Sequence, residues 1–529
     1  MFPHRDCPLD ARTLGLTCFV RRSVTRWRIR SGCNTLQIII EGSRNTHSLD
    51  RNYSYRPRRD DDREQLSPVP FLTTPSTHVA VLGSGITGLT CAFYLLRAGA
   101  QVTIIEPRQE IGGLSTHQDY GCFTWDRFYH CILKSDTSLL ALLDDLNLSS
   151  RIAWTPTKVG FFADGHLHSL STSVDFLRFP ALSVWHKFRL AAGILYASRI
   201  EDGRALEAQL ASQWLKRTFG EDVYRKIWEP LLKCKLGTCC DEASAAFIWA
   251  TIARLHSTRQ TTSGRESLGY VRGGYRTVFK TLVSEIGRLG GRIVTSSPIR
   301  CVSPTPNAIE VVAEKLHDRY DKVITTLPSP LLAAVAPQLD SGYLTRLLNT
   351  KYLGVVCFAL VLRQALTPYY VTNIAVDVPF TGIIEMTNLI STTETAGHHL
   401  VYLPKYTSPQ DPLFDSGTDA LWQTFEAGLQ RIIPSFRSSD VVARYLSRER
   451  YVQPLPVLHY STLAPPMRTN IERLFVANTS QLVNSTVNNN EMVKIAHRAV
   501  HCALAEYLPE AQANPASTRT PSYDGLVAD

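Results

Sequence analysis

Hydrophobic and polar residues follow two distinct patterns between residues 79 and 106. Four apolar residues, Val79–Leu82, form a short run of the kind that a buried parallel strand shows. From Leu89 to Leu96, apolar residues recur at helical spacing, and Gly99 marks the end of that pattern. A second apolar run, 102–105, follows. The pattern therefore predicts a βαβ unit.

Three glycines lie at the turn between the first strand and the helix, and an acid ends the second strand. Gly83 permits a tight turn, Gly85 lets the backbone approach a pyrophosphate, and Gly88 lets the helix pack closely on the strand. The amino end of the helix offers N–H groups and a partial positive charge to phosphates. Glu106 can accept hydrogen bonds from ribose hydroxyls. These features predict a dinucleotide site; an ordinary tight turn is the alternative.

The pattern after the βαβ unit changes several times along the chain. A helix-rich region covers roughly 176–255, and a helix is expected from Tyr275 to Leu289 with strands after it. Short β-rich runs surround one helix between 344 and 463, and a strand at 474–477 precedes a C-terminal helix. This order predicts an α/β protein: a Rossmann-like domain interrupted by a helical insertion and by a mixed β-sheet substrate domain.

Composition is that of a globular protein, with 44% hydrophobic and 19% charged residues among 529. The net charge is +9, but thirteen Arg, no Lys and eight Asp or Glu before Thr77 give +5, so the remainder carries only +4. We therefore expect no nucleic-acid partner. No apolar run approaches the ~20 residues of a membrane span. A cytoplasmic protein is expected, and peripheral membrane contact stays open.

The first 76 residues lack a long periodic pattern and end in a polar, Pro-containing stretch. We interpret them as a disordered or spurious extension; because 19–30 is basic, a targeting segment is the alternative. Twelve scattered cysteines favour reduced thiols. The Cys234–Cys239 spacing has no matching second pair of ligands, so no metal site is predicted.

A second glycine pair, Gly112-Gly113, follows the second strand, and no second GxGxxG occurs in the chain. One nucleotide carrying its own redox group is the simplest interpretation. The stretch around this pair resembles the flavoprotein amine oxidase superfamily. Together with "WEPLLKCKLG", "LGYVRGGYRTV" and "RLFVANTSQ", it resembles the protoporphyrinogen-oxidase-like branch over roughly 77–500. Amine oxidases, phytoene desaturases and UDP-galactopyranose mutases belong to the same superfamily.

The resemblance implies FAD as cofactor and an oxidoreductase that transfers hydride from an organic small molecule to the flavin. Oxygen or a quinone would be the electron acceptor. The implied organisation is an N-terminal extension over 1–76, an FAD-binding domain over 77–150, 264–330 and 464–507, a helical insertion over 151–263, a substrate-binding β-rich domain over 331–463 and a disordered tail over 508–529.

The resemblance also implies which residues contact FAD. They form the phosphate turn, the ribose acid with its neighbours, the second glycine pair, the backbone position beside adenine and the C-terminal segment near the flavin. In that order they are Gly83, Gly85, Ile86, Thr87 and Gly88; Glu106, Pro107 and Arg108; Gly112, Gly113 and Leu114; Ile299; and Thr479 and Asn490.

Three departures from the superfamily pattern bear on catalysis. Asn478-Thr479 stands where Gly-Asp is frequent, and Leu114 follows the glycine pair where Arg is frequent. Glu491 follows Asn490, and its carboxylate would repel a reduced flavin if it faced the ring. Either that side chain turns away or cofactor use has drifted, so a degenerate FAD-binding protein is one alternative function.

Candidate chemistry centres on "FYHCIL". His130 is a candidate proton donor because imidazole titrates near neutral pH, and a structural histidine is the alternative. Tyr129 can wall the flavin ring, and Lys233, Lys235 and Lys405 can meet an anionic substrate; a core aromatic and surface lysines are the simpler explanations. The stretch resembles a mutase segment, so a flavin-dependent isomerase of a nucleotide sugar is a second hypothesis. No Ser-His-Asp arrangement is recognisable.

Overall fold

The structure is a computed structural model that describes residues 77–258 and 267–505. The expectations for 1–76 and 508–529 lie outside the described residues. Among the residues that are described, no helix combines the length and the apolar character needed to cross a bilayer.

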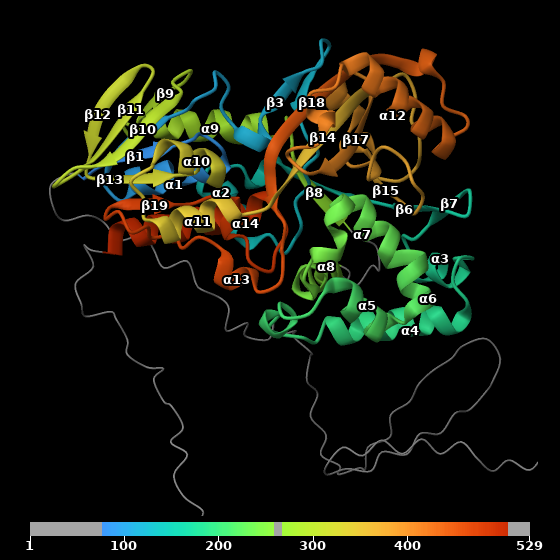
Figure 1. The fold of residues 1–529 in the computed structure, drawn as a ribbon. Helices are drawn as coiled ribbons and strands as arrows, with labels where there is room; N and C mark the ends of the chain where they lie inside the picture. Colours follow the sequence, from blue (N-terminus) through green and yellow to red (C-terminus); the bar gives the residue numbers. More distant parts are fainter. Residues whose placement is uncertain (1–76, 259–266, 506–529) are drawn as a thin grey trace, which may run out of the picture. The chain divides into compact units, whose positions relative to one another are not determined.

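A five-stranded parallel sheet forms the nucleotide-binding part of the fold (Figure 1). Every pairing in it is parallel, and alternate residues of its strands enter two different cores, as expected of a sheet covered on both faces. Its order is β19 (Leu474–Val476), β13 (Lys322–Thr325), β1 (His78–Leu82), β2 (Gln101–Ile105) and β9 (Arg292–Val294).

Helices cover one face of this sheet, and a smaller sheet with two helices shares the core on the other. The first core includes Val79, Val81 and Phe475 and is closed by α1 (Ile86–Arg97), α2 (Thr137–Asp145), α9 (Tyr275–Arg288) and α14 (Asn489–Leu504). The second is closed by β10 (Ile299–Pro304), β11 (Ile309–Ala313), β12 (Leu316–Tyr320), α10 (Ser329–Val335) and α11 (Ser341–Asn349).

A seven-stranded mixed sheet contains the long strand β14, all eleven residues of which are buried. One face packs on α12 (Thr418–Ile432) through Phe358 and Phe425, and the other carries Tyr402 and Cys357. The order is β18 (Val441–Pro454), β14 (Tyr352–Leu362), β17 (His399–Thr407), β16 (Gly382–Glu385), β15 (Val371–Ile374), β6 (Val159–Ala163) and β7 (His166–Ser169).

The segment expected to be a helical insertion also contributes strands. Within 151–263, β6 and β7 form a hairpin that extends the mixed sheet, and β5 (Ile152–Pro156) pairs with β8 (Ser267–Val271). The hairpin turns at Asp164-Gly165, whose φ values of 50° and 75° are those of a tight primed turn. The helices are α3 (Ser173–Arg178), α4 (Val184–Ala197), α5 (Ala211–Phe219), α6 (Glu221–Val223), α7 (Glu229–Leu236) and α8 (Ala245–Thr258).

Candidate functional site

The turn between β1 and α1 has no room for side chains at two of its glycines. Gly83 has φ +104°, and a Cβ on Gly88 would lie 2.0 Å from the carbonyl oxygen of Gly83. The helix therefore packs directly on the turn. No side chain caps the amino end of α1 at Gly85, and no acid lies in its first turn. The first amides of α1 can thus bind an anion.

The second glycine pair lies against this turn. Gly112 donates its N–H to the carbonyl of Ser84 at 3.0 Å and forms a parallel bridge with Gly85. A Cβ on Gly113 would lie 3.2 Å from the Cα of Gly85. Gly112 and Gly113 both have positive φ, 119° and 57°. Two glycine turns therefore face each other without side chains between them, which is the backbone cradle that a diphosphate requires.

Glu106 is held beside this cradle. Its side chain is buried, and its Oε2 accepts hydrogen bonds from the N–H and the hydroxyl of Ser84, both at 2.7 Å. Its Oε1 accepts from the N–H of Arg108 at 2.9 Å. A carboxylate offers about four acceptor positions, so these three bonds fix the group and leave one position for a further donor. This geometry fits a ribose hydroxyl.

The segments on either side of Glu106 connect it to two other sheets. The guanidinium of Arg108 donates to both carboxylate oxygens of Glu449 in β18, at 2.6 and 2.8 Å. The carbonyl of Glu106 accepts from the N–H of Ser297 at 3.0 Å, which places Ile299 at the nearby start of β10. Arg108 and the segment that leads into β10 are therefore both joined to Glu106, and Arg108 is engaged by a carboxylate that the sequence did not indicate.

The amino end of α14 meets the second glycine pair. The Asn489 side chain accepts a hydrogen bond from the Ser115 hydroxyl, 2.9 Å away, in the short 3-10 turn Gly113–Ser115 that also holds Leu114. The next residue, Asn490, uses its side-chain oxygen to accept from the N–H groups of Ser138 and Leu139, both at 3.0 Å, and so caps α2. Its amide oxygen is thus committed to the scaffold.

Glu491 and Asn478 have clear partners. The Glu491 carboxylate lies 3.0 Å from the ammonium of Lys494 on the same helix, so its charge is compensated along α14. The Asn478 side chain accepts from the N–H of Ser480 and donates to the carbonyl of Leu327, at 2.9 and 2.6 Å. Asn478 therefore ties the ends of β19 and β13 together beside Thr479.

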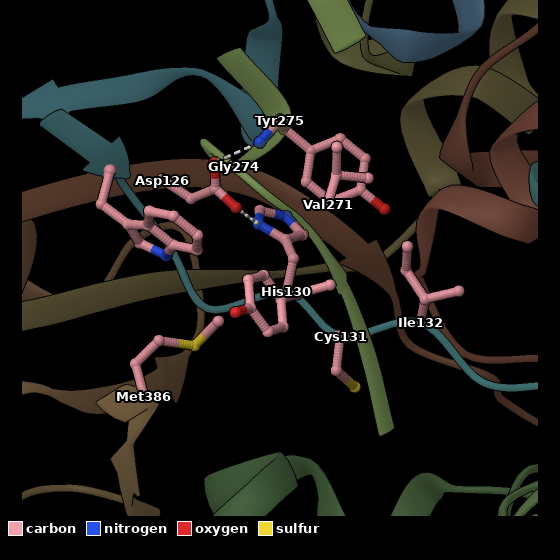
Figure 2. Close-up of a pocket in the computed structure, with 10 residues that line it drawn as sticks. Asp126, His130, Cys131, Ile132, Val271, Gly274, Tyr275 and Met386 are labelled. Atoms are coloured by element: carbon pink, nitrogen blue, oxygen red, sulfur yellow. Dashed lines mark hydrogen bonds and ion pairs between the residues drawn. The ribbon is translucent and has the colours of Figure 1, made fainter. Parts of the chain in front are cut away.

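Asp126, His130 and Ser115 come together near the glycine pair. No motif in the sequence indicates this cluster. Asp126 ends β4 (Thr124–Asp126) and is buried; its Oδ2 lies 3.7 Å from Nδ1 of His130. Nε2 of His130 lies 3.3 Å from the hydroxyl of Ser115. Figure 2 shows the Asp126 carboxylate directed at the imidazole, in a small cavity bounded by Tyr275 and Met386. Ser115 is itself buried, so its hydroxyl faces the protein interior rather than solvent.

The structure separates the other candidate residues. Tyr129 and Tyr406 share a hydrogen bond of 2.9 Å between their hydroxyls, and burial raises the pKa of both phenols. Lys405 precedes Tyr406 in β17, so it points to the opposite face of the sheet, where α12 packs. Lys233 is exposed and forms an ion pair with Glu229 at 2.7 Å. Lys405 and Lys233 are therefore not brought to the tyrosine pair.

Lys235 has a different environment from Lys233. Its ammonium lies 5.4 Å from the ring centroid of Phe247. Burial, with a smaller effect of Arg254, lowers the pKa of Lys235 to about 8. A lysine of this kind can lose its proton near neutral pH.

Two models of known protein families match the chain. The model for flavin containing amine oxidoreductase matches residues 86–488, and that for pyridine nucleotide-disulphide oxidoreductase matches residues 31–122. Protoporphyrinogen oxidase 2 of Arabidopsis thaliana is 27% identical over 161 residues, 29% of this chain and 31% of the relative. The 15-cis-phytoene desaturase of Synechococcus elongatus is 21% identical over 243 residues, 42% and 50% of the two chains. The matched parts thus span half or less of these relatives.

Solved structures share the fold over most of the chain. A putative protoporphyrinogen oxidase from Exiguobacterium sp. aligns with a TM-score of 0.66 at 16% identity, covering 82% of this chain and all of that one. Putrescine oxidase bound to putrescine aligns with a TM-score of 0.63 at 16% identity, covering 82% and 99%. The predicted superfamily, fold class and cofactor are confirmed. Because the first family model covers most of the chain, the protein belongs to the flavin containing amine oxidoreductase family, whose cofactor is FAD.

Proposed function

We propose that the protein oxidises an organic small molecule by transferring hydride from that molecule to FAD. One observation carries this proposal: two opposed glycine turns lie at the uncapped amino end of α1, with the fixed carboxylate of Glu106 beside them. When bound, FAD supplies the redox chemistry, and the protein binds and orients it. The mutase-like alternative is not favoured, because the matched family and the relatives named above are oxidoreductases.

The proposed cofactor contacts follow from the geometry around Gly85 and Glu106. The amides that begin α1 bind the diphosphate, and the Glu106 carboxylate accepts from a ribose hydroxyl. The amino end of α14, which meets Ser115, would offer a partial positive charge to a flavin held here, reduced by the Asn488 cap and by Glu491 in its first turn. The complete proposed set is Gly83, Gly85, Ile86, Thr87, Gly88, Glu106, Pro107, Arg108, Gly112, Gly113, Leu114, Ile299 and Thr479; Asn490 supports it by capping α2.

His130 is the residue that we propose to hold a proton at this site. Asp126 faces Nδ1 of the ring, and Ser115 faces Nε2. A proton on Nε2 can be donated to the Ser115 oxygen, whose own proton is donated to the Asn489 oxygen. The carboxylate faces the ring at 3.7 Å without a hydrogen bond to Nδ1, and the hydroxyl connects the ring to the amino end of α14.

The proposed substrate is a hydrophobic or cyclic molecule that lies near Tyr129 and Tyr406. Both side chains are half-buried, and this burial raises the pKa values of the phenols, so they present neutral hydroxyls and apolar rings. Lys235 would pair with an anionic group of the substrate if one is present. Oxygen or a quinone is the proposed electron acceptor.

The test begins with the visible spectrum of the purified full chain. We expect a flavin spectrum, or uptake of added FAD, and bleaching when an oxidisable substrate is added without oxygen. Suitable panels contain amines such as putrescine and cyclohexylamine, reduced porphyrins and carotenoid precursors. Re-oxidation by oxygen and by a soluble quinone then compares the two acceptors. A Gly88→Val variant, whose side chain would collide with the Gly83 carbonyl, is the matched control that should not retain FAD.

Two results would contradict the proposal. A correctly folded chain that refuses FAD would remove its basis. A flavin-containing chain that no substrate bleaches, but that rearranges a nucleotide sugar after dithionite reduction, would replace the oxidoreductase with an isomerase.

A further inference from the structure

Helix α4 turns an apolar face to solvent. Its exposed positions recur at three- and four-residue spacing, so they lie on one side of the helix. All of them are apolar: Val184, Trp185, Phe188, Ala191, Ala192, Leu195 and Tyr196. The side chains of Val184, Trp185 and Phe188 are 82%, 65% and 64% exposed. An amphipathic helix normally buries this face, so the arrangement needs an explanation.

Exposed apolar side chains are concentrated on this part of the molecule. Of the twelve large apolar residues that are exposed within the described ranges, seven lie between positions 174 and 196. Two of them, Val174 and Leu177, belong to α3, and Lys187 of α4 donates to the Leu177 carbonyl at 2.6 Å. The two helices are therefore in contact, and we call their exposed apolar residues together the α3–α4 surface: Val174, Leu177, Val184, Trp185, Phe188, Leu195 and Tyr196.

The buried side of α4 packs tightly against neighbouring helices. Loose packing of the helix therefore does not explain its exposed apolar face. Gly193 approaches Phe219 of α5 so closely that a Cβ would lie 2.4 Å from the ring. Trp249 of α8 donates to the carbonyl of Ala197 at 3.0 Å. The other side of α4 is thus held by α5 and α8.

Positive charge borders the α3–α4 surface. A groove beside α4 is lined by Trp185, Phe188 and Tyr196 together with Arg189 and Arg217. The Arg189 guanidinium donates to the Arg217 carbonyl at 3.4 Å, and that of Arg217 to the Gln209 amide oxygen at 2.7 Å. Within the described ranges, neither arginine forms an ion pair with a carboxylate. Their charges are therefore open to an anion from outside.

The sequence of this region carries the same charge bias. Between 174 and 199, the basic residues are Arg178, Lys187, Arg189 and Arg199, and the one acid is Asp175, so the net charge is +3. Asp175 is used inside the fold, because its carboxylate accepts from the N–H of Thr172 in the capping box of α3. No acid lies on α4 itself, and the carboxylate of Asp222 in α6 lies 3.3 Å from Nε2 of His186 on α4.

We infer that the α3–α4 surface docks on an anionic lipid bilayer. Trp185, Phe188 and Tyr196 enter the boundary between headgroups and acyl chains, while Arg189 and Arg217 contact lipid phosphates. A helix of fourteen residues is about 21 Å long and, lying in the surface, presents its whole apolar face at once. The described chain has no membrane-spanning helix, so the contact is peripheral. This inference does not depend on the proposed oxidation.

A second copy of the chain fits the surface less well. A symmetric contact would bring the same patch of both copies together, and since α4 carries no acid, Arg189 and Arg217 would face a patch of like charge. Lipid phosphates supply the missing negative charge.

The experiment is co-sedimentation of the full chain with vesicles. We expect binding to phosphatidylcholine mixed with phosphatidylglycerol, with weaker binding to phosphatidylcholine alone and at high salt. The double variant Trp185→Ser with Phe188→Ser should need at least ten times more lipid for half-maximal binding. The variant Arg189→Gln with Arg217→Gln should lose the preference for anionic vesicles. Leu348→Ser with Leu331→Ser, two exposed apolar residues on α11 and α10, is the matched control and should bind like the unaltered chain.

Folding of each variant is checked by circular dichroism and by FAD content before vesicles are added. Equal binding of the Trp185/Phe188 variant and the control pair would overturn the inference. So would a lipid-free dimer that dissociates in the Trp185/Phe188 variant, since the surface would then belong to a second copy.

Discussion

His497 makes the folded protein sensitive to acid in a way that can be calculated. It lies in α14, is 5% exposed, and its ring centre is 4.4 Å from that of Tyr94 in α1. Neither ring nitrogen has a hydrogen-bond partner within the described residues. Burial, with a smaller effect of His501, lowers the pKa of His497 to about 4, whereas Asp145 acts in the opposite direction. The folded state therefore disfavours the imidazolium.

The direction in which stability changes with pH follows from proton binding to His497 in the folded and the unfolded chain. Above pH 6.5 the His497 ring is neutral whether the chain is folded or unfolded. Between pH 6.5 and 4 the unfolded chain binds a proton and the folded chain does not, so the free energy of unfolding falls as the pH falls. Over this interval the free energy of unfolding falls by roughly 3 kcal/mol, because each pH unit contributes about 1.4 kcal/mol.

The variant His497→Phe keeps a planar ring and removes the titration. Urea unfolding of the variant and of the unaltered chain is followed by circular dichroism from pH 7.5 to pH 4, at one saturating FAD concentration. Other titrating groups are common to both proteins and cancel in the difference. We expect the variant to gain about 3 kcal/mol relative to the unaltered chain as the pH falls. Parallel pH profiles for His497→Phe and the unaltered chain would refute the reasoning.

Three further substitutions test the nucleotide-binding part. Gly88→Ala places a methyl group against the Gly83 carbonyl. The free energy of unfolding should fall by about 1–3 kcal/mol. Calorimetry should also show at least tenfold weaker FAD binding. Glu106→Gln puts an amide N–H, a donor, where the Ser84 N–H donates to a carboxylate oxygen. We therefore expect at least tenfold lower FAD affinity, measured by fluorescence quenching, with little change in fold. Asn490→Ala removes the cap of α2 and should cost about 1 kcal/mol in urea unfolding while the bound-flavin spectrum stays the same; an altered spectrum would place its amide beside the flavin instead.

The parts of this protein that could be predicted from its sequence are those with a local cause. The strand, helix and strand from His78 to Ile105 follow from apolar periodicity and from glycines that no other residue can replace. The β6–β7 hairpin was not expected, although Asp164-Gly165 between two apolar runs is a local signal for it.

The contacts that could not be predicted join residues distant in the sequence. Ser115, His130 and Asn489 meet only after α14 packs against the nucleotide-binding part, and no spacing announces that contact. The separation of Lys405 from Tyr406 needed the orientation of β17 in its sheet, because neighbouring residues of a strand face opposite sides.

The strand order of the parallel sheet has a consequence for synthesis of the chain. β1 is flanked by β13, and the N–H of His78 bonds to Asp321, 243 positions later. β13 in turn needs β19, which ends at Val476. In a nascent chain the edge of β1 therefore stays unpaired until β13, which ends at Thr325, has been made, and the edge of β13 stays unpaired until β19 follows. A sheet closed by such distant pairings forms slowly and leaves its strand edges open to wrong pairing in the meantime.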